Sequence, residues 1–323
     1  MTSKPLSVLF TSAGRRVELV NCFTAAAQKL GVSISTHACD LKPELSAACH
    51  VASQSFAVPR CDTPDYVERL LEYCDRHKID LLIPTIDPEL YPLALAKRQF
   101  AEVGTRVHVS GPETIEIVRD KARTTEVLQD HGVPVPKTGS VEAAREHPED
   151  WEWPAFIKPS GGSASRGIDI IESPSMIADS YDEPMILQQL LKGDEYTINM
   201  MVDEDGAIRA VIPHRRLSVR AGEVEKGVTV RRSDIDDIAA RIVEALPDPE
   251  GVMCFQLIAD ERTGPRVFEI NARFGGGYPL ADRAGARFAE RLLYQLGDGT
   301  GWTDSPWKEG VTMLRYDAAV FLD

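Results

Sequence analysis

Three polar side chains, Gln256, Glu269 and Asn271, stand among apolar neighbours in two segments that can pair as a hairpin. Strand side chains alternate between faces, so Glu269 and Asn271 point the same way. A turn centred between Arg262 and Thr263 would set Gln256 opposite Glu269. Magnesium prefers oxygen ligands and keeps waters and nucleotide phosphates in its shell, so one carboxylate and two amides predict a magnesium site. The alternative is a strand pair whose polar face simply meets solvent.

A lysine and a glycine-serine loop lie upstream of this hairpin. Lys158 ends the apolar run 155–157, and the loop that follows contains Gly161, Gly162 and Ser163. Successive backbone amides of such a loop can cradle phosphate oxygens. The loop is not a Walker A motif, because no Gly-Lys-Ser/Thr ending opens a long helix. We therefore expect a phosphate site of another type, with an ordinary surface turn as the alternative.

Two arginines are candidates for stabilising a developing negative charge. Residues 213–220 alternate so that Arg216 shares one strand face with Arg220, and Arg273 follows Asn271 at the same two-residue spacing. Guanidinium groups in these places suit an anionic substrate or a triphosphate. For residues 213–220 the alternative is a solvated strand face.

Taken in order, the strand lysine, the glycine-serine loop, a later glutamate (Glu195) and the segment 271–277 resemble the ATP-grasp superfamily. The resemblance spans nearly the whole chain and is closest to stand-alone enzymes similar to the large subunit of carbamoyl-phosphate synthase. It implies that ATP lies between two sheets and is used with Mg²⁺, with Mn²⁺ as the alternative metal. The residues that match the family's nucleotide-binding positions are Lys121, Lys158, Gly161, Gly162, Ser163, Gln188, Gln189, Leu190 and Glu195; the metal ligands are Gln256, Glu269 and Asn271, and the catalytic residues are Arg216 and Arg273.

The resemblance also implies individual roles. Lys121 and Lys158 contact phosphates, the glycine-serine loop is a mobile lid, Glu195 binds ribose, and Arg273 steadies an acyl phosphate. Either Gln188 or Gln189 offers its amide to adenine, and the sequence leaves that choice open. The first domain helps to hold the second substrate in this family, so further candidates are Ser12, Arg15, Asp40 and Asp87.

The elements that position these residues follow an α/β pattern, with an α+β lid. Buried strands alternate with amphipathic helices in the first third, which predicts a parallel sheet with helices on both faces. We expect a Rossmann-like pre-ATP-grasp domain over 1–113, a bridging helix and lid over 114–184, and a catalytic ATP-grasp subdomain over 185–323. Single helices are predicted over 113–131 and 279–296, and a final strand over 313–322.

Composition excludes several classes of protein. The 323 residues carry a formal net charge of -14 without a long basic run, which argues against a nucleic-acid partner. No apolar stretch approaches 20 residues and no signal-peptide pattern is present, so we expect no membrane span and a cytoplasmic location. Six scattered cysteines without a C-x-x-C pair predict neither a zinc site nor a disulfide framework.

What the resemblance implies is a carboxylate-amine ligase that joins a small-molecule carboxylate and an amine through an acyl phosphate and releases ADP and phosphate. Related enzymes are often homodimers. One alternative is an ATP-binding regulatory protein without ligase turnover. A nicotinamide oxidoreductase is a third reading, but residues 11–16 contain one glycine where the dinucleotide fingerprint needs three.

Overall fold

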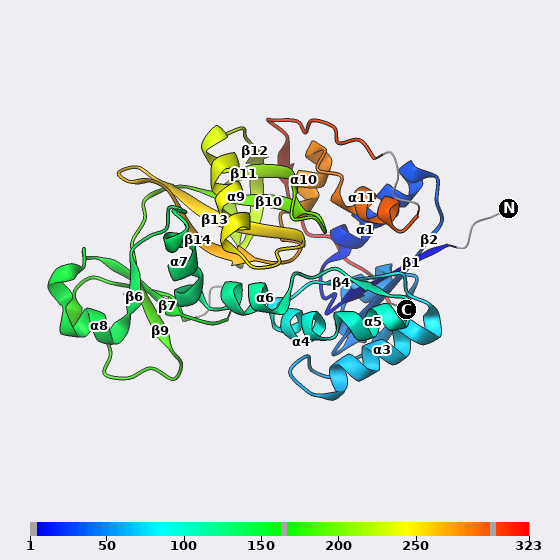
Figure 1. The fold of residues 1–323 in the computed structure, drawn as a ribbon, viewed down its shortest axis with the longest axis horizontal. Coiled ribbons are helices and arrows are strands. Elements are labelled where there is room, and N and C mark those ends of the chain that lie inside the picture. Colours follow the sequence, from blue (N-terminus) through cyan, green and yellow to red (C-terminus); the bar gives the residue numbers. More distant parts are fainter. Residues whose placement is uncertain (1–4, 163–166, 298–301, 323) are drawn as a thin grey trace.

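The computed structural model describes residues 5–162, 167–297 and 302–322, and these residues form three β-sheets. Figure 1 shows a parallel sheet near the N-terminus, a large antiparallel sheet beside it, and a small sheet at the opposite end of the molecule. The architecture is α/β with antiparallel sheets in the second half, in agreement with the fold class expected from the sequence.

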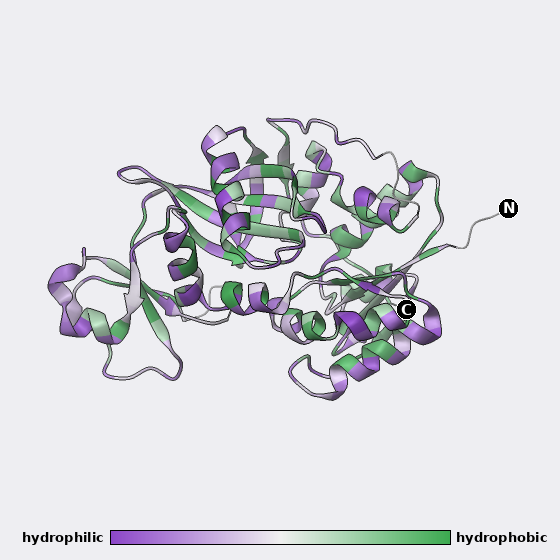
Figure 2. Cartoon of the chain, in the orientation of Figure 1, coloured by the Kyte–Doolittle hydropathy of each residue, from purple (hydrophilic) through white to green (hydrophobic). Residues whose placement is uncertain are grey.

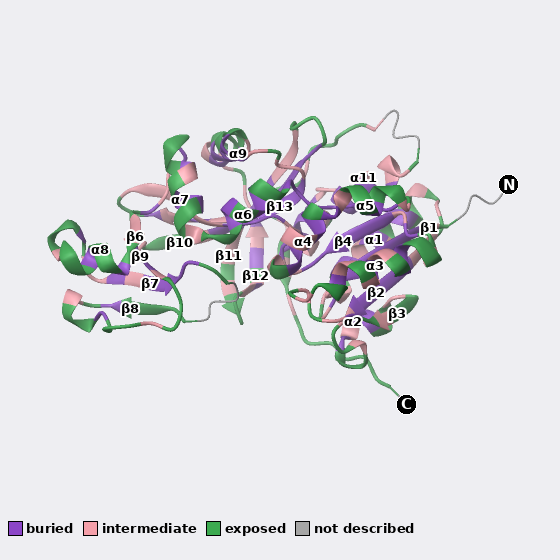
Figure 3. Cartoon of the chain, turned by 60° about the horizontal axis from the view of Figure 1, so that its bottom comes forward, coloured by how far each residue is buried: buried purple, intermediate pink, exposed green. Residues whose placement is uncertain are grey.

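The N-terminal sheet is parallel, in the order β3-β2-β1-β4-β5. Val8 and Phe10 of its central strand pack with α1 and α2, whereas Leu9 packs on the other face with α3 and α4. Helices therefore cover both faces of a sheet whose central strands are buried (Figure 3). The elements are β1 (Leu6–Thr11), α1 (Val17–Leu30), β2 (Ile34–Asp40), α2 (Ala47–Val51), β3 (Gln54–Ala57), α3 (Asp65–His77), β4 (Leu81–Pro84), α4 (Leu90–Leu95), α5 (Lys97–Glu102) and β5 (Arg106–Val107).

The large sheet is antiparallel, in the order β14-β13-β10-β11-β12-β15. Met200 packs with helix α9 on one face, and its neighbour Met201 packs with the segment around Tyr278 on the other. The covering helices carry both hydrophilic and hydrophobic residues, as Figure 2 shows. The elements are β10 (Gly193–Val202), β11 (Ile208–Arg220), β12 (Glu223–Thr229), α9 (Ser233–Ala245), β13 (Gly251–Asp260), β14 (Gly264–Asn271) and β15 (Thr312–Leu314).

The small sheet has the order β6-β9-β7-β8 and its own core, in which Leu187 contacts the region of Trp151. Strand β9 begins at Met185, where the sequence predicts the start of the catalytic subdomain, yet β9 pairs with β6 and β7. The boundary between the sheets therefore falls after Gln189. The elements are β6 (Thr138–Ser140), α8 (Val141–Glu146), β7 (Ala155–Pro159), β8 (Asp169–Ile171) and β9 (Met185–Gln189).

The single bridging helix predicted over 113–131 is wrong, because the structure has two helices, α6 (Pro112–Arg119) and α7 (Lys121–Asp130). Asp120 between them is extended, with φ -107° and ψ 112°, and its carboxylate accepts hydrogen bonds from the N–H groups of Ala122 and Arg123. A capping aspartate satisfies backbone donors that a continuous helix would have bonded internally, so it starts a new helix.

Two other predicted elements are also shorter than expected. The helix predicted over 279–296 divides into α10 (Tyr278–Ala284) and α11 (Phe288–Gln295), because Gly285 takes the left-handed φ of 112° that ends α10. The final strand is limited to β15, and the described residues after Leu314 follow no regular element. None of the helices among the described residues is both long enough and apolar enough to cross a membrane.

Candidate active site

The hairpin of β13 and β14 has the register that the sequence predicts, with Gln256 opposite Glu269 and Cys254 opposite Asn271. The turn itself differs from the prediction, because Asp260 lies opposite Gly264 and the turn is centred on Arg262 rather than between Arg262 and Thr263. The register shifts by one residue just beyond Gln256, where Phe268 is the extra residue of a β-bulge, and this shift gives the predicted pairing of Gln256 with Glu269. Gln256 Oε1 accepts a hydrogen bond from Arg216 Nη1 at 3.1 Å. Three oxygen-bearing side chains therefore lie on neighbouring positions of one strand pair.

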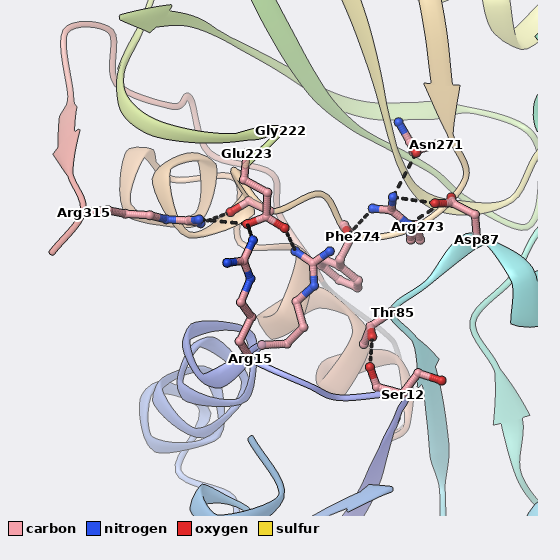
Figure 4. Close-up of polar contacts among 12 residues, drawn as sticks. Ser12, Arg15, Thr85, Asp87, Gly222, Glu223, Asn271, Arg273, Phe274 and Arg315 are labelled. Carbon is pink, nitrogen blue, oxygen red and sulfur yellow. Dashed lines mark hydrogen bonds and ion pairs between the residues drawn. The ribbon is translucent and has the colours of Figure 1, made fainter. Parts of the chain in front are cut away.

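Arg273 joins this hairpin to the N-terminal domain. Its Nε and Nη2 donate to the two carboxylate oxygens of Asp87, at 3.0 and 2.7 Å, and Nη2 also donates to Asn271 Oδ1 at 2.9 Å (Figure 4). Burial opposes the charge on Arg273, but the carboxylate of Asp87 raises the pKa of this guanidinium above its ordinary value. Asp87 follows β4, so the contact fixes the carboxyl edge of the parallel sheet against the metal-ligand candidates.

The loop that carries Asp87 is held by the buried carboxylate of Glu89, which binds the residues just before Asp87. Glu89 accepts hydrogen bonds from the hydroxyl of Ser12 at 2.7 Å and from the N–H groups of Thr85 and Ile86 at 2.6 and 3.1 Å. Ser12 has the left-handed φ of 49°, which is uncommon for a residue with a side chain. Glu89 thus fixes two loops at the carboxyl edge of the sheet, and sequence reasoning did not single it out.

Lys158 is buried on β7, with 4% of its surface exposed, and its Nζ donates to Gln188 Oε1 at 2.9 Å. Burial lowers the pKa of Lys158 to about 8; Glu269 opposes this shift and Lys121 adds to it. Gln189 belongs to the other face of the strand, and its N–H donates to the carbonyl of residue 137. Of the two candidate glutamines, only Gln188 reaches the lysine; Leu190 follows directly after the strand.

Lys121 holds the described part of the glycine-serine loop. Its Nζ donates to the carbonyls of Gly161 and Gly162 at 3.1 and 2.9 Å, and its N–H donates to the carbonyl of Ser160. The Ser160 hydroxyl in turn donates to the capping carboxylate of Asp120 at 2.6 Å. The loop is therefore attached to the break between α6 and α7. Ser163 lies outside the described residues.

Glu195 is bound by Arg216 rather than standing free for a ribose hydroxyl. Burial raises the pKa of Glu195, although the arginine opposes that shift. Arg216 also donates to the carbonyl of Gly222 at 2.8 Å. The register of β11 against β12 shifts at Leu217, so the common face predicted for residues 213–220 breaks there, and Arg220 instead pairs with Asp317 on the surface.

One pocket is lined by several residues of the predicted site. Its lining includes Lys121, Gly162, Glu269 and Asn271, together with Asp87 from the N-terminal domain. The predicted site residues that do not line it are Lys158, Gly161, Gln188, Gln189, Leu190, Glu195, Arg216, Gln256 and Arg273. The lining residues that the sequence analysis did not single out have no motif to reveal them; they are Pro88, Val118, Arg119, Thr124, Phe268 and Ile270.

The oxygen donors fit a magnesium ion that is carried on nucleotide phosphates. Glu269 supplies a carboxylate, and the amide oxygens of Gln256 and Asn271 already act as acceptors towards cationic groups. Among the residues that the structure describes, no group of three or more His, Cys, Asp or Glu side chains could hold a metal ion. One carboxylate and two amides therefore suit a metal that takes the rest of its shell from phosphate and water.

A second cluster lies beyond Arg273 and was only partly foreseen. Arg15, a candidate from the sequence, and its neighbour Arg16 pair with Glu223, which also binds Arg315 (Figure 4). Asp40, another candidate, accepts a hydrogen bond from the N–H of Gly14 at 2.8 Å and so supports this loop.

Comparison with known proteins places two domains on the chain. Residues 8–108 match the model of the PylC-like N-terminal domain, and residues 118–277 match the ATP-grasp domain. The D-alanine–D-alanine ligase of Chromohalobacter salexigens is 27% identical over 116 residues, which are 32% of this chain and 34% of the ligase. The carbamoyl phosphate synthase large chain of Rubrobacter xylanophilus is 25% identical over 62% of this chain and 21% of its own. The match therefore spans about a third or less of these curated relatives.

Solved structures share the fold. The biotin carboxylase of Campylobacter jejuni, solved as a β,γ-ATP complex, superposes with a TM-score of 0.73 at 14% identity, over 93% of this chain and 72% of that one. The biotin carboxylase domain dimer of the 2-oxoglutarate carboxylase of Hydrogenobacter thermophilus, solved with MgADP, ADP and bicarbonate, gives 0.70 at 17% identity, over 93% and 70%.

Proposed function

Because this chain belongs to the ATP-grasp superfamily, we propose that it is an ATP-dependent carboxylate-amine ligase. In this proposal a substrate carboxylate attacks the γ-phosphorus of ATP, ADP leaves, and an amine then displaces phosphate from the acyl phosphate to form an amide. The observation that carries the proposal is the convergence of Glu269 and Asn271 with Lys121 and Gly162 around one pocket, closed by Asp87.

No protein nucleophile is required for these steps, because the substrate carboxylate is the nucleophile. Fixed charges supply the catalysis instead, by binding the phosphates and the developing anion more tightly in the transition state. Lys121 and Lys158 bind phosphate oxygens, and Gly161 and Gly162 approach them with backbone amides. Magnesium, when bound, neutralises charge on the phosphates, and Gln256, Glu269 and Asn271 would hold it.

We assign Arg273 and Arg216 to the reacting groups. Arg273 is held rigidly by Asp87 and Asn271, so its guanidinium needs little reorganisation to stabilise the acyl phosphate. Arg216 bridges Gln256 and Glu195, which orients the amide ligand. Of the two open candidates, Gln188 is assigned to adenine, since it contacts Lys158. Glu195 is assigned to ribose, for which Arg216 would have to share the carboxylate, and Gln189 and Leu190 contribute backbone at the end of β9.

The proposal extends to a cytoplasmic protein, where ATP is supplied, and to a homodimer, because one structural relative is a domain dimer. The amide product is peptide-like. Manganese is the proposed substitute for magnesium, because it accepts the same oxygen ligands.

The test is mass spectrometry of the protein incubated with MgATP and pooled carboxylates and amines. We expect ADP and a new mass one water lighter than an acid plus an amine. AMP would contradict the acyl-phosphate route, and unchanged ATP with intact nucleotide binding would favour the regulatory alternative.

A pair of variants tests the metal assignment in the same assay. Glu269→Ala should lower ADP formation by about 100-fold or more, because the only carboxylate of the ligand set is lost. Glu261→Ala removes an exposed glutamate from the turn of the same hairpin and is the matched control. Equal turnover in both variants would refute the role given to Glu269.

A further inference from the structure

Three arginines surround one glutamate where the N-terminal domain meets the large sheet. Glu223 Oε2 lies 3.0 Å from Arg315 Nη1 and 3.8 Å from Arg15 Nη2, and Glu223 Oε1 lies 3.3 Å from Arg16 Nη1. The arginines come from the loop after β1 and from the segment after β15, whereas Glu223 begins β12. Figure 4 shows the labelled members of this cluster converging from separate parts of the chain.

The cluster has more positive than negative charge. Within the part of the chain that the structure describes, Glu223 is the acid recorded in an ion pair with each of these three arginines, so three cations share one carboxylate. The side chains of Arg16, Glu223 and Arg315 are only 19%, 25% and 28% exposed, so water compensates little of their charge, whereas Arg15 is 70% exposed and is solvated at the edge of the cluster. Elsewhere in the site the pairing is one to one, as in Arg273 with Asp87.

The charge on Arg16 is opposed by its surroundings. Burial lowers the pKa of Arg16; Glu223 opposes this, but Arg273 and Arg315 lower the pKa further. Arg15 and Arg16 also stand immediately before helix α1, whose N-terminus has no side-chain cap and whose first turn carries one acidic residue, the exposed Glu18. The positive end of a 14-residue helix adds to the field of the guanidinium groups.

The cluster is continuous with the candidate active site. Arg315 donates to the carbonyl of Gly276, in the loop that directly follows Arg273. A Cβ at Gly276 would lie 2.6 Å from the Glu223 carboxylate, so the glycine leaves room for this carboxylate in its present position. The residue before Glu223 also contacts the site: the carbonyl of Gly222 accepts a hydrogen bond from Arg216, which donates to Gln256 as well. An anion among the three arginines would therefore lie beside backbone that also contacts Arg216 and that directly follows Arg273.

We propose that Arg15, Arg16 and Arg315 bind an oxyanion of one of the two substrates, so that the substrate carries a carboxylate or phosphate group besides the groups that react. This inference rests on the proposed ligase function. Glu223 keeps the arginines together before the substrate arrives and competes with it afterwards. Guanidinium groups suit this role, because they bind carboxylate and phosphate with paired hydrogen bonds.

Matched probes that differ by one anionic group test the proposal. Isothermal titration calorimetry would compare L-glutamate with L-glutamine, and O-phosphoserine with serine, at equal ionic strength, on the full chain with and without MgADP. We expect the anionic member of one pair to bind about tenfold tighter than its neutral partner, since a group with one net charge faces uncompensated arginines. The pair that discriminates identifies the anion as carboxylate or phosphate.

Variants separate binding from a structural role. Arg315→Gln should abolish the discrimination, and so should Arg15→Gln, whose side chain is 70% exposed and therefore tolerates replacement. Glu223→Gln should instead tighten the anionic probe by about tenfold, because the competing carboxylate is removed. Arg60→Gln, which breaks an exposed pair with Asp62, is the control and should change nothing.

Three results would overturn the proposal: equal binding of charged and neutral probes in both pairs, discrimination that persists in Arg15→Gln and Arg315→Gln, or weaker anion binding in Glu223→Gln. The MgADP titration distinguishes this failure from failure of the ligase function. Normal nucleotide binding without discrimination rejects the anion subsite alone, whereas absent nucleotide binding rejects the proposed function.

Discussion

Lys158 should take up a proton when ATP binds. In the free protein its ammonium group is buried and meets the neutral oxygen of Gln188 at 2.9 Å, with the ring of Phe268 centred 5.4 Å away. Burial lowers the pKa of this lysine to about 8, with Glu269 opposing the shift. A phosphate group beside it would favour the charged form, which raises the pKa again.

The magnitude follows from the shift. A pKa of about 8 in place of 10.5 means that charging Lys158 costs about 3 kcal/mol more than in water, an order-of-magnitude figure. If phosphate restores the ordinary pKa, binding takes up about 0.1 proton at pH 7, about 0.5 at pH 8 and about 0.9 at pH 9. Affinity for ATP should therefore fall with rising pH above 8, and approach a tenfold loss per pH unit near pH 9.

The lowered pKa of Lys158 also affects the stability of the free protein. This contribution to stability rises with pH, whereas the affinity for ATP falls. Between pH 8 and pH 10.5 the unfolded chain binds the proton that folded Lys158 has released, so the contribution of Lys158 to the free energy of unfolding rises with pH in that window.

Calorimetry of nucleotide binding in two buffers of different ionisation enthalpy measures the proton uptake directly. Lys158→Arg keeps a charge at every pH used and should reduce the uptake at pH 8 to near zero. Lys137→Arg, an exposed lysine of the same subdomain, is the control and should match the wild-type protein. Identical uptake in the wild-type protein and Lys158→Arg, or uptake that does not change between pH 7 and 9, would refute the reasoning.

Two further substitutions probe how the site is supported. Glu89→Ala removes the acceptor of the N–H groups of Thr85 and Ile86 and should lower the free energy of unfolding by about 1–3 kcal/mol in urea titrations, because these donors lose their partner. Glu68→Ala, on an exposed helix face, should not. Gly277→Ala places a Cβ 2.6 Å from the buried ring of His214 although the backbone φ of -83° permits alanine. It should cost about 1–3 kcal/mol, and an unchanged thermal midpoint would contradict this packing.

Much of the fold could be predicted because its signals are local. The runs that become β1 and β4 are apolar on both faces, and Pro112 and the capping Asp120 are short-range features. The helix predictions are wrong at the two places where a single residue ends a helix. Helical periodicity continues across Asp120 and Gly285, but a carboxylate that caps N–H groups and a glycine at positive φ each end a helix.

The site, like the fold, has one part that local sequence features predict and another part that they do not. The pairing of Gln256 with Glu269 is predicted from one hairpin, although the structure reaches it through a turn centred on Arg262 and a β-bulge at Phe268 that the sequence analysis did not foresee. The partner of Arg273 is 186 positions away, in the other domain, and no spacing rule selects Asp87 among the acids of the chain. Contacts between domains depend on how two sheets pack, and that information is spread over the whole core.

The net charge of the chain does not reveal a local cluster of positive charge such as the one around Glu223. The chain carries -14 overall, yet Arg15, Arg16 and Arg315 meet a single acid at the domain junction. Coulomb energy falls with distance and is screened beyond about 10 Å, so a local excess of two positive charges acts on a nearby anion almost independently of the acidic surface. The acidic surface even helps selection, because its net charge repels anions that approach away from this junction. A substrate anion would then be drawn to a place where Arg273 and the nucleotide phosphates can meet its reacting group.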